Sequence, residues 1–343
     1  MKYMHLGKTD LVVSRTAFGA LPIQRIPKDS AVRLLHKALD NGITFFDTAR
    51  YYSDSEEKLG TAFRGIRDRV VIATKAMAST KKEVLASCET SLRQLHTEYI
   101  DLMQLHNPSR HPQRSDAENT WEGLVRAREK GMVRWIGLTN HKLPIAEEAV
   151  SSGMFDSIQF PLNYLSSEDE LKLIALCKEN GCGCIAMKAM SGGLITNAAA
   201  AFAFLRQFDN VVPIWGIQRE EELDEFISLE ESPPELSDTL QKCISEDKNT
   251  LSGQFCRGCG YCMPCTAAIE INWVARMSLL LRRAPSAGFF TKEWSGKMMK
   301  IRDCTECGIC KSRCPYQLDI PVLLKMNLTD YETFEIERPD LQA

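Results

Sequence analysis

The 343-residue chain lacks the long apolar runs of a membrane protein, since no stretch approaches the roughly 20 apolar residues of a membrane-spanning helix. It also lacks a surplus of either charge. Its 42 Lys and Arg residues stand against 45 Asp and Glu, which gives a formal net charge of −3. This balance leaves no electrostatic footprint for nucleic acid or for an anionic membrane. We therefore expect neither as a partner.

Signals for export and for repeat architectures are missing as well. The opening sequence MKYMHLGKTD has no apolar core of the kind that secretory signal peptides contain. There is no low-complexity segment and no repeat longer than an alternation of strand-like and helix-like patterns. The expectation is a soluble cytoplasmic protein.

A glycine-rich turn after the first predicted strand, which an open dinucleotide-binding sheet would show, is also absent. Up to about residue 230, near-continuous apolar strands are each followed by a helical pattern such as 29–41 or 80–96, the latter with Thr80 as its N-cap. This alternation indicates parallel strands buried on both faces. Eight such units predict an α/β fold, a (β/α)8 TIM barrel, with a hairpin over 1–14 that plugs one end. The predicted strands are 15–20, 43–48, 70–74, 101–106, 133–138, 156–160, 183–188 and 211–216.

Cysteine is what the sequence has in excess, with 13 residues, of which eight lie between Cys256 and Cys314. Secreted disulfide scaffolds are short and cysteine-dense throughout, which this chain is not. Clustered thiols in a reducing cytosol more often bind metal. The other five cysteines are expected to be small buried side chains. They are Cys88, Cys177, Cys182, Cys184 and Cys243.

The clustered cysteines form two runs whose spacing favours iron–sulfur clusters. The second run reads C-x₂-C-x₂-C-x₃-C and is followed by Pro315, which is the pattern of bacterial ferredoxins. The first run departs from this pattern, because two residues instead of three precede its last cysteine. Zinc sites use two separated CxxC pairs. Two [4Fe–4S] clusters are the favoured hypothesis, and a single cluster or zinc are the alternatives. The runs are Cys256, Cys259, Cys262, Cys265 and Cys304, Cys307, Cys310, Cys314.

The ferredoxin pattern also predicts that ligands cross between the runs, because the fourth corner of a cube points away from a three-cysteine loop. Cys314 would then complete the first cluster and Cys265 the second. The predicted organisation is a barrel over 1–230, a linker over 231–254, a small, mostly helical ferredoxin-like domain over 255–321 and a tail over 322–343. Within the third part, 271–283 has the periodicity of a helix.

Polar side chains at the ends of consecutive barrel strands point to an active site. Asp47, Lys75 and His106 end the second, third and fourth predicted strands, and Tyr52 follows in the loop after Asp47. Active sites of β/α barrels lie at the C-terminal ends of the strands. Any one of these residues alone would pass for an ordinary loop residue, but the four together predict one pocket.

Four segments then carry a resemblance to the aldo/keto reductase family: FFDTARYYSDSEEKLG (45–60), IATK (72–75), DLMQLH (101–106) and GMVRWIGLTNH (131–141). The resemblance implies that Tyr52 is the proton donor, with Lys75 and Asp47 as its partners, and that His106 orients the substrate. The chemistry agrees, because a neighbouring Lys⁺ favours the phenolate and makes a phenol a better proton donor.

The resemblance also implies where a nicotinamide cofactor binds. Thr139, Asn140 and Gln159 correspond to the carboxamide contacts. Met187 stands where many members offer an aromatic ring, and a thioether can supply polarizable contact area. Lys188 is a candidate pyrophosphate ligand, with a solvated lysine as the alternative.

The segment 215–226 corresponds to the adenosine-binding end, with Gly216, Arg219 and Glu225 as contacts. Arg219 is the only cation there for the 2′-phosphate of NADPH, and Glu222 stands where a phosphate-binding arginine is often found. NADH is therefore as plausible a cofactor as NADPH.

The cysteine-rich part resembles the dicluster domains of one subgroup of aldo/keto reductases. The function that follows is an NAD(P)H-dependent reductase of small carbonyl compounds with two [4Fe–4S] clusters. The clusters would be structural or regulatory, or would exchange electrons with an external partner. The alternative is an iron–sulfur electron carrier or redox sensor whose barrel binds a nucleotide without turnover of a carbonyl.

Overall fold

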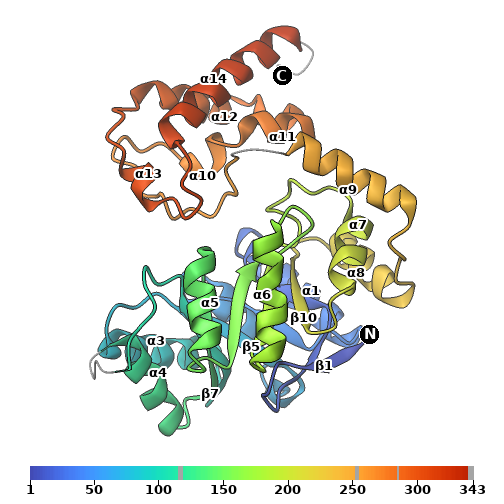
Figure 1. Cartoon of the computed structure of the whole chain (residues 1–343), viewed down its shortest axis with the longest axis vertical. Helices are drawn as coiled ribbons and strands as arrows, with labels where there is room; N and C mark the ends of the chain where they lie inside the picture. The colour runs from blue at the N-terminus through green and yellow to red at the C-terminus, as the bar shows by residue number, and fades with distance from the viewer. Residues whose placement is uncertain (115–118, 252–254, 284–285, 339–343) are drawn as a thin grey trace. The chain divides into compact units, whose positions relative to one another are not determined.

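The computed structural model describes residues 1–114, 119–251, 255–283 and 286–338, which form two compact units (Figure 1). The first unit comprises Met1–Ala189 and Ala198–Ile244, and the second comprises Met190–Asn197 and Ser245–Ala343. The end of the predicted linker (252–254) and the end of the predicted tail (339–343) lie outside the described residues. Among the helices of the described ranges, none has both the length and the apolar composition of a bilayer-spanning helix.

In the first unit, parallel strands close into a barrel in the order β10-β3-β4-β5-β6-β7-β8-β9. This confirms the predicted (β/α)8 architecture, and all eight strands lie at or within two residues of the predicted ranges. The strand predicted over 183–188 is β9, which ends at Met187, so that Lys188 lies outside it. The strands are β3 (Ala17–Gly19), β4 (Phe45–Asp47), β5 (Val71–Ala76), β6 (Ile100–His106), β7 (Val133–Thr139), β8 (Ser157–Pro161), β9 (Gly183–Met187) and β10 (Val211–Gly216).

Helices follow the strands and run alongside them, as α5 and α6 show clearly in Figure 1. Helix α3 begins as predicted at Thr80, whose side chain accepts a hydrogen bond from the Glu83 amide in a capping box. The helices of this unit are α1 (Lys28–Asp40), α2 (Ser55–Ala62), α3 (Lys81–Gln94), α4 (Thr120–Glu129), α5 (Leu143–Ser151), α6 (Glu168–Glu179), α7 (Ala198–Arg206) and α8 (Glu220–Glu231).

An antiparallel hairpin of β1 (Tyr3–His5) and β2 (Val12–Ser14) closes one end of the barrel. Its residues Leu6 and Leu11 are buried in a core cluster with side chains from the barrel strands. Gly7 approaches the backbone of β9 so closely that an added Cβ would lie 2.4 Å from the Gly183 nitrogen. Only glycine fits there, and its φ of +58° is one that glycine adopts without strain.

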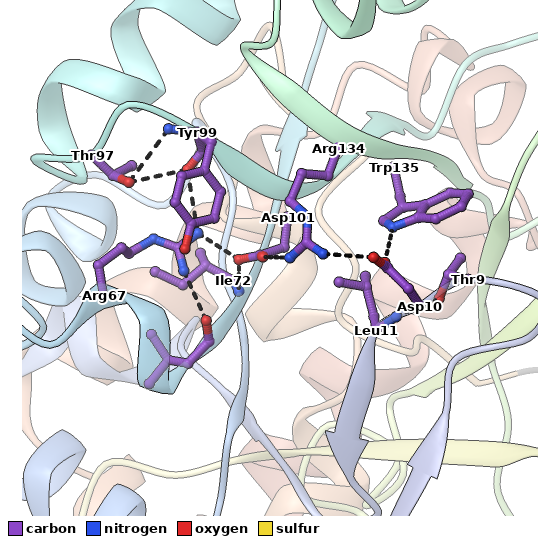
Figure 2. Close-up of polar contacts among 11 residues, drawn as sticks. Thr9, Asp10, Leu11, Arg67, Ile72, Thr97, Tyr99, Asp101, Arg134 and Trp135 are labelled. Atoms are coloured by element: carbon purple, nitrogen blue, oxygen red, sulfur yellow. Dashed lines mark hydrogen bonds and ion pairs between the residues drawn. The ribbon is translucent and has the colours of Figure 1, made fainter.

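Figure 2 shows the polar network that fixes this hairpin. The buried Asp101 carboxylate, on β6, pairs with Arg67 and Arg134 and accepts the Ile72 amide. Arg134 also pairs with Asp10 in the hairpin. Because these ion pairs lie at the N-terminal ends of the strands, they stabilise the end opposite the one where β/α barrels carry their active sites.

The second unit is helical in its described part. Helix α9 (Asp238–Thr250) occupies most of the predicted linker and enters this unit at Ser245. The unit also contains α10 (Ile271–Val274), α11 (Met277–Arg283), α12 (Lys292–Met299), α13 (Ile309–Arg313) and α14 (Ile320–Glu337). The long helix α14 packs against α10, α11, α12 and α13 (Figure 1). The region expected to be a polar tail is therefore mostly an ordered part of this unit.

The predicted helix over 271–283 is interrupted between α10 and α11. Asn327 of α14 is the physical reason: its side chain accepts the Ser278 amide at 2.8 Å and donates to the Ala275 carbonyl at 3.2 Å. A side chain from a distant helix thus satisfies backbone groups that a continuous helix would pair internally. The break places Arg276 at the junction.

Candidate active site and cluster-binding site

A buried ion pair lies at the centre of the predicted active site. Lys75 Nζ donates to both carboxylate oxygens of Asp47, at 2.8 and 2.7 Å, and to the Thr48 carbonyl at 2.8 Å. Both side chains are almost fully buried. Burial lowers the pKa of Lys75 and raises the pKa of Asp47, and the attraction between the two charges opposes both shifts. Three hydrogen bonds and the paired charge hold the ammonium group in one position.

Tyr52 and His106 lie beside this pair. Lys75 Nζ is 5.3 Å from the centroid of the Tyr52 ring. The rings of Tyr52 and His106 meet edge to face, with centroids 6.1 Å apart. The structure thus brings together all four residues that the sequence placed at or after the strand ends.

His106 is held in its neutral form. Burial, together with the positive charge of Lys75, lowers the pKa of its imidazole to about 3. A neutral imidazole can donate one hydrogen bond to a substrate oxygen without adding a charge to the site.

A pair of glutamines extends this site into the barrel, and sequence reasoning assigned a role only to one of them. The Gln159 side chain hydrogen-bonds Asp47, which favours the ionised carboxylate. Its carbonyl oxygen accepts a hydrogen bond from Gln104 Nε2 at 2.8 Å. Both amides are buried. Gln104 stands inside the segment DLMQLH, and its only signal in the sequence is that it interrupts an apolar strand.

Cysteines of both runs lie together in the second unit. A cavity is lined by Cys265 of the first run together with Cys304, Cys307 and Cys310 of the second, and Cys262 also reaches it. Burial raises the pKa of the Cys310 thiol, and the charges of Cys304 and Cys265 act in the same direction. Thr266, next to Cys265, contacts the Cys307 sulfur at 3.8 Å.

Cys314 lies near Cys262 of the first run. Burial raises the pKa of Cys262 to about 12, and the charges of Cys256, Cys259 and Cys314 add to the effect. Cys265 thus lines one cavity with the first three cysteines of the other run, and Cys314 is near enough to Cys262 to raise its pKa.

Five thiols from both cysteine runs line this one cavity. Zinc holds its thiolates at about 2.3 Å, so that four ligands converge on one point. Cysteines spread around a cavity fit the larger [4Fe–4S] core, with Cys265, Cys304, Cys307 and Cys310 as one donor set.

Comparison with known proteins decides the family. The aldo/keto reductase family model matches residues 15–208, more than half of the chain. The chain belongs to the aldo/keto reductase family. A 4Fe-4S dicluster domain matches residues 255–319 at its C-terminal end.

Similar proteins are known from a bacterium and a plant. The chain is 28% identical over 215 residues to aldo-keto reductase YhdN of Bacillus subtilis (strain 168), covering 57% of this chain and 64% of that protein. It is 29% identical over 210 residues to L-galactose dehydrogenase of Arabidopsis thaliana, covering 56% of this chain and 66% of that protein. The chain thus spans just under two thirds of these relatives.

Solved reductases share the fold. The holo form of aldo-keto reductase AKR11C1 from Bacillus halodurans superposes with a TM-score of 0.63 at 21% identity, covering 72% of this chain and 96% of that one. The thermostable aldo-keto reductase Tm1743, solved in complex with epalrestat, has a TM-score of 0.60 at 25% identity, covering 72% of this chain and all of that one.

In this aldo/keto reductase, two of the expected nicotinamide contacts touch each other, and hydrogen bonds hold two more in place. Thr139 Oγ1 contacts the Met187 sulfur at 3.8 Å, which joins the ends of β7 and β9. Asn140 is fixed by a hydrogen bond to the Pro108 carbonyl at 2.9 Å. Lys188 has a φ of +59°, and Asn163 donates to its carbonyl at 2.9 Å. Asn163 is thus a further positioning residue for this loop.

The segment expected to bind adenosine already has its helix start capped by a carboxylate. Glu222 Oε2 accepts hydrogen bonds from the backbone amides of Gln218 and Arg219 at the start of α8, at 2.9 and 3.1 Å. Its Oε1 accepts a hydrogen bond from Arg219 Nε at 2.9 Å. The carboxylate therefore occupies the amides that would receive a phosphate and pairs with the nearby cation. Gly216 and Glu225 are both exposed.

Proposed function

We propose that this aldo/keto reductase reduces a small carbonyl compound with a nicotinamide cofactor and carries two [4Fe–4S] clusters in its C-terminal unit. The observation that carries the proposal is the buried Lys75–Asp47 pair, with its ammonium group 5.3 Å from the Tyr52 ring. A buried, hydrogen-bonded charge at the mouth of a barrel has few structural uses and suits proton transfer.

The proposed roles of the four residues are those that the family resemblance implies, and their proximity supports them. The reduced nicotinamide, when bound, supplies a hydride to the carbonyl carbon. The Tyr52 hydroxyl then protonates the substrate oxygen. Lys75 stabilises the phenolate that remains, and Asp47 keeps Lys75 charged and in position. Neutral His106 donates a hydrogen bond to the same substrate oxygen and orients the carbonyl.

The cofactor contacts would come from Thr139, Asn140 and Gln159, with Met187 against the nicotinamide and Lys188 near the pyrophosphate. At the adenosine end, Gly216, Arg219 and Glu225 would contribute. Since Glu222 already occupies the α8 amides and pairs with Arg219, we propose weak discrimination between NADPH and NADH, or a preference for NADH.

Two clusters are proposed because the eight cysteines come in two runs of four, and Cys265 of the first run lines a cavity with three cysteines of the second. Cys256, Cys259, Cys262 and Cys314 would hold one cluster, and Cys265, Cys304, Cys307 and Cys310 the other. Clusters pass electrons singly when bound, whereas a hydride carries two, and the sequence has no flavin-binding signature. An external one-electron partner is therefore part of the proposal, and the protein is proposed to be cytoplasmic.

Anaerobic purification, iron and sulfide analysis and a carbonyl panel with both cofactors test this function. We expect eight irons and eight sulfides per chain, as two cubane clusters contain, and turnover of at least one carbonyl substrate. Clusters without any carbonyl turnover would favour the other candidate, a redox sensor or electron carrier with a nucleotide-binding barrel. Zinc in place of iron would contradict the cluster assignment.

A further inference from the structure

Arg276 is a buried cation without a carboxylate partner. Only 5% of the Arg276 surface is exposed to solvent. Its Nη2 donates to the Gly192 carbonyl at 2.7 Å, and its Nε has no hydrogen-bond partner. Across the described ranges, no Asp or Glu forms an ion pair with it. Burying an unpaired charge is costly, and such charges are normally paired with an anion. We therefore expect an anion other than a carboxylate to lie next to the Arg276 guanidinium.

The first cysteine loop supplies the neighbours of this guanidinium. An added Cβ on Gly258, between Cys256 and Cys259, would lie 2.4 Å from Arg276 Nη1. The Gly258 amide donates to the Cys256 sulfur at 3.4 Å. Burial lowers the pKa of Arg276, and the Cys256 sulfur is the charged group that opposes this effect. The guanidinium thus packs directly on a loop that provides two of the proposed cluster ligands.

We infer that Arg276 is the counter-cation of the cluster held by the first cysteine run and raises the reduction potential of that cluster. The inference rests on the proposed function, since it requires the cluster. A cubane with four thiolate ligands is an anion, and net charge and nearby hydrogen bonds set its potential. One electron from an external donor adds one negative charge to the cluster, while Arg276 keeps its proton. A buried positive charge favours the more negative state.

A purely structural role is the competing explanation, because Arg276 also holds the 190–197 loop through Gly192. The two roles predict different observables. A structural role would change the retention of iron but leave the potential of retained clusters unaltered. A counter-cation role would change one cluster's potential and leave the other cluster unaltered.

The test is an anaerobic redox titration of the holoenzyme with dithionite, followed by electron paramagnetic resonance. The variants are Arg276→Gln, which removes the charge, and Arg276→Lys, which keeps it. Arg282→Gln is the matched control, since Arg282 lies in the same unit, is half exposed and pairs with Asp330. For Arg276→Gln we expect the equilibrium constant for reducing one cluster to fall about tenfold or more, which is about 59 mV for one electron.

Arg276→Lys and the control should keep both potentials close to those of the parent protein. Unchanged potentials in Arg276→Gln, or an equal shift of both clusters, would overturn the inference. If Arg276→Gln loses iron, retention in Arg276→Lys supports a need for the charge, and loss in both variants overturns it. Absence of iron from the parent protein would instead contradict the proposed function, which iron analysis shows before any titration.

Discussion

Tyr52 and its neighbour Tyr51 form a natural pair for testing the proton donor. Tyr52 lies beside Lys75 and His106, whereas Tyr51 is 73% exposed. Tyr52→Phe removes the hydroxyl that protonates the substrate oxygen. We expect carbonyl reduction to fall by ~10²–10⁴, the usual contribution of general acid catalysis, with nearly unchanged nicotinamide affinity.

Steady-state kinetics and cofactor titration measure both quantities. Tyr51→Phe should retain full activity. Full activity in Tyr52→Phe would remove this residue from the mechanism.

His106 gives a prediction about pH. Burial and the Lys75 charge lower its pKa to about 3, whereas a free imidazole takes up a proton near pH 6.5. As the pH falls from 8 to 5, the folded protein therefore leaves this ring neutral while an unfolded chain would protonate it. The contribution to stability is present above about pH 6.5 and decreases as the pH falls below it.

Nuclear magnetic resonance of ring-labelled histidine measures this directly, with His106→Gln to assign the signal. The His106 resonance should stay constant between pH 8 and 5. A titration step near pH 6.5 for this ring would contradict the prediction.

Sequence reasoning found the charged residues of the site better than its amides. Asp47, Lys75 and His106 were predictable because strand ends of a parallel barrel meet at one edge. Gln104 was not, since strands buried on both faces carry no alternation that tells an inward residue from an outward one. Arg276 was equally hidden, because a helical pattern does not show what a distant segment will place against it.

At the scale of elements, we propose the start of helix α8 as the determinant of cofactor choice. Glu222→Gln keeps the side chain's size but removes the charge that pairs with Arg219. The freed cation can then bind a 2′-phosphate. We expect the affinity for NADPH relative to NADH to rise about tenfold, since a hydrogen bond to a charged group contributes ~1.5 kcal/mol or more. Fluorescence quenching measures both dissociation constants.

Glu221→Gln is the control, because Glu221 is exposed on the same turn and has no part in the capping of α8. Equal effects of the two substitutions would mean that general charge near the site is responsible. A parent protein that binds NADPH a hundredfold more tightly than NADH would refute the preference itself.

The two cysteine runs give a prediction about which cysteines ligate which cluster. Cys265→Ser should damage the same cluster as Cys307→Ser, and Cys259→Ser should damage the other, because Cys265 lines the cavity of the second run. Electron paramagnetic resonance of each purified variant identifies the lost signal. Matching losses in Cys265→Ser and Cys259→Ser would show that each run serves its own cluster.

The barrel strands were predictable to within two residues because their length, apolar content and bounding turns are local features. Two elements of the C-terminal unit were not. The break at Ala275 depends on Asn327, and α14 depends on packing against four other helices. Both are consequences of contacts between segments far apart in the sequence, which periodicity does not record.

At the scale of the whole molecule, residues 190–197 connect β9 of the barrel to α7 but belong to the second unit. Gly192 and Gly193 both have positive φ, yet an added Cβ would lie 3.1 Å from Arg276 Nη1 at Gly192 and meet nothing within 4 Å at Gly193. Gly192→Ala should therefore speed the loss of iron to a chelator several-fold relative to Gly193→Ala, although the backbone strain is similar. Equal rates would show that this loop does not support the clusters.

Because residues 190–197 belong to the second unit, the gene cannot be cut cleanly between the two units. A fragment that begins at residue 245 encodes the cysteines but omits a piece of the unit that holds them, and a fragment that stops at 244 keeps that piece without its neighbours. During synthesis, residues 190–197 leave the ribosome long before the rest of their unit exists. Moving this unit to another barrel would thus require grafting an internal loop as well as adding a C-terminal extension.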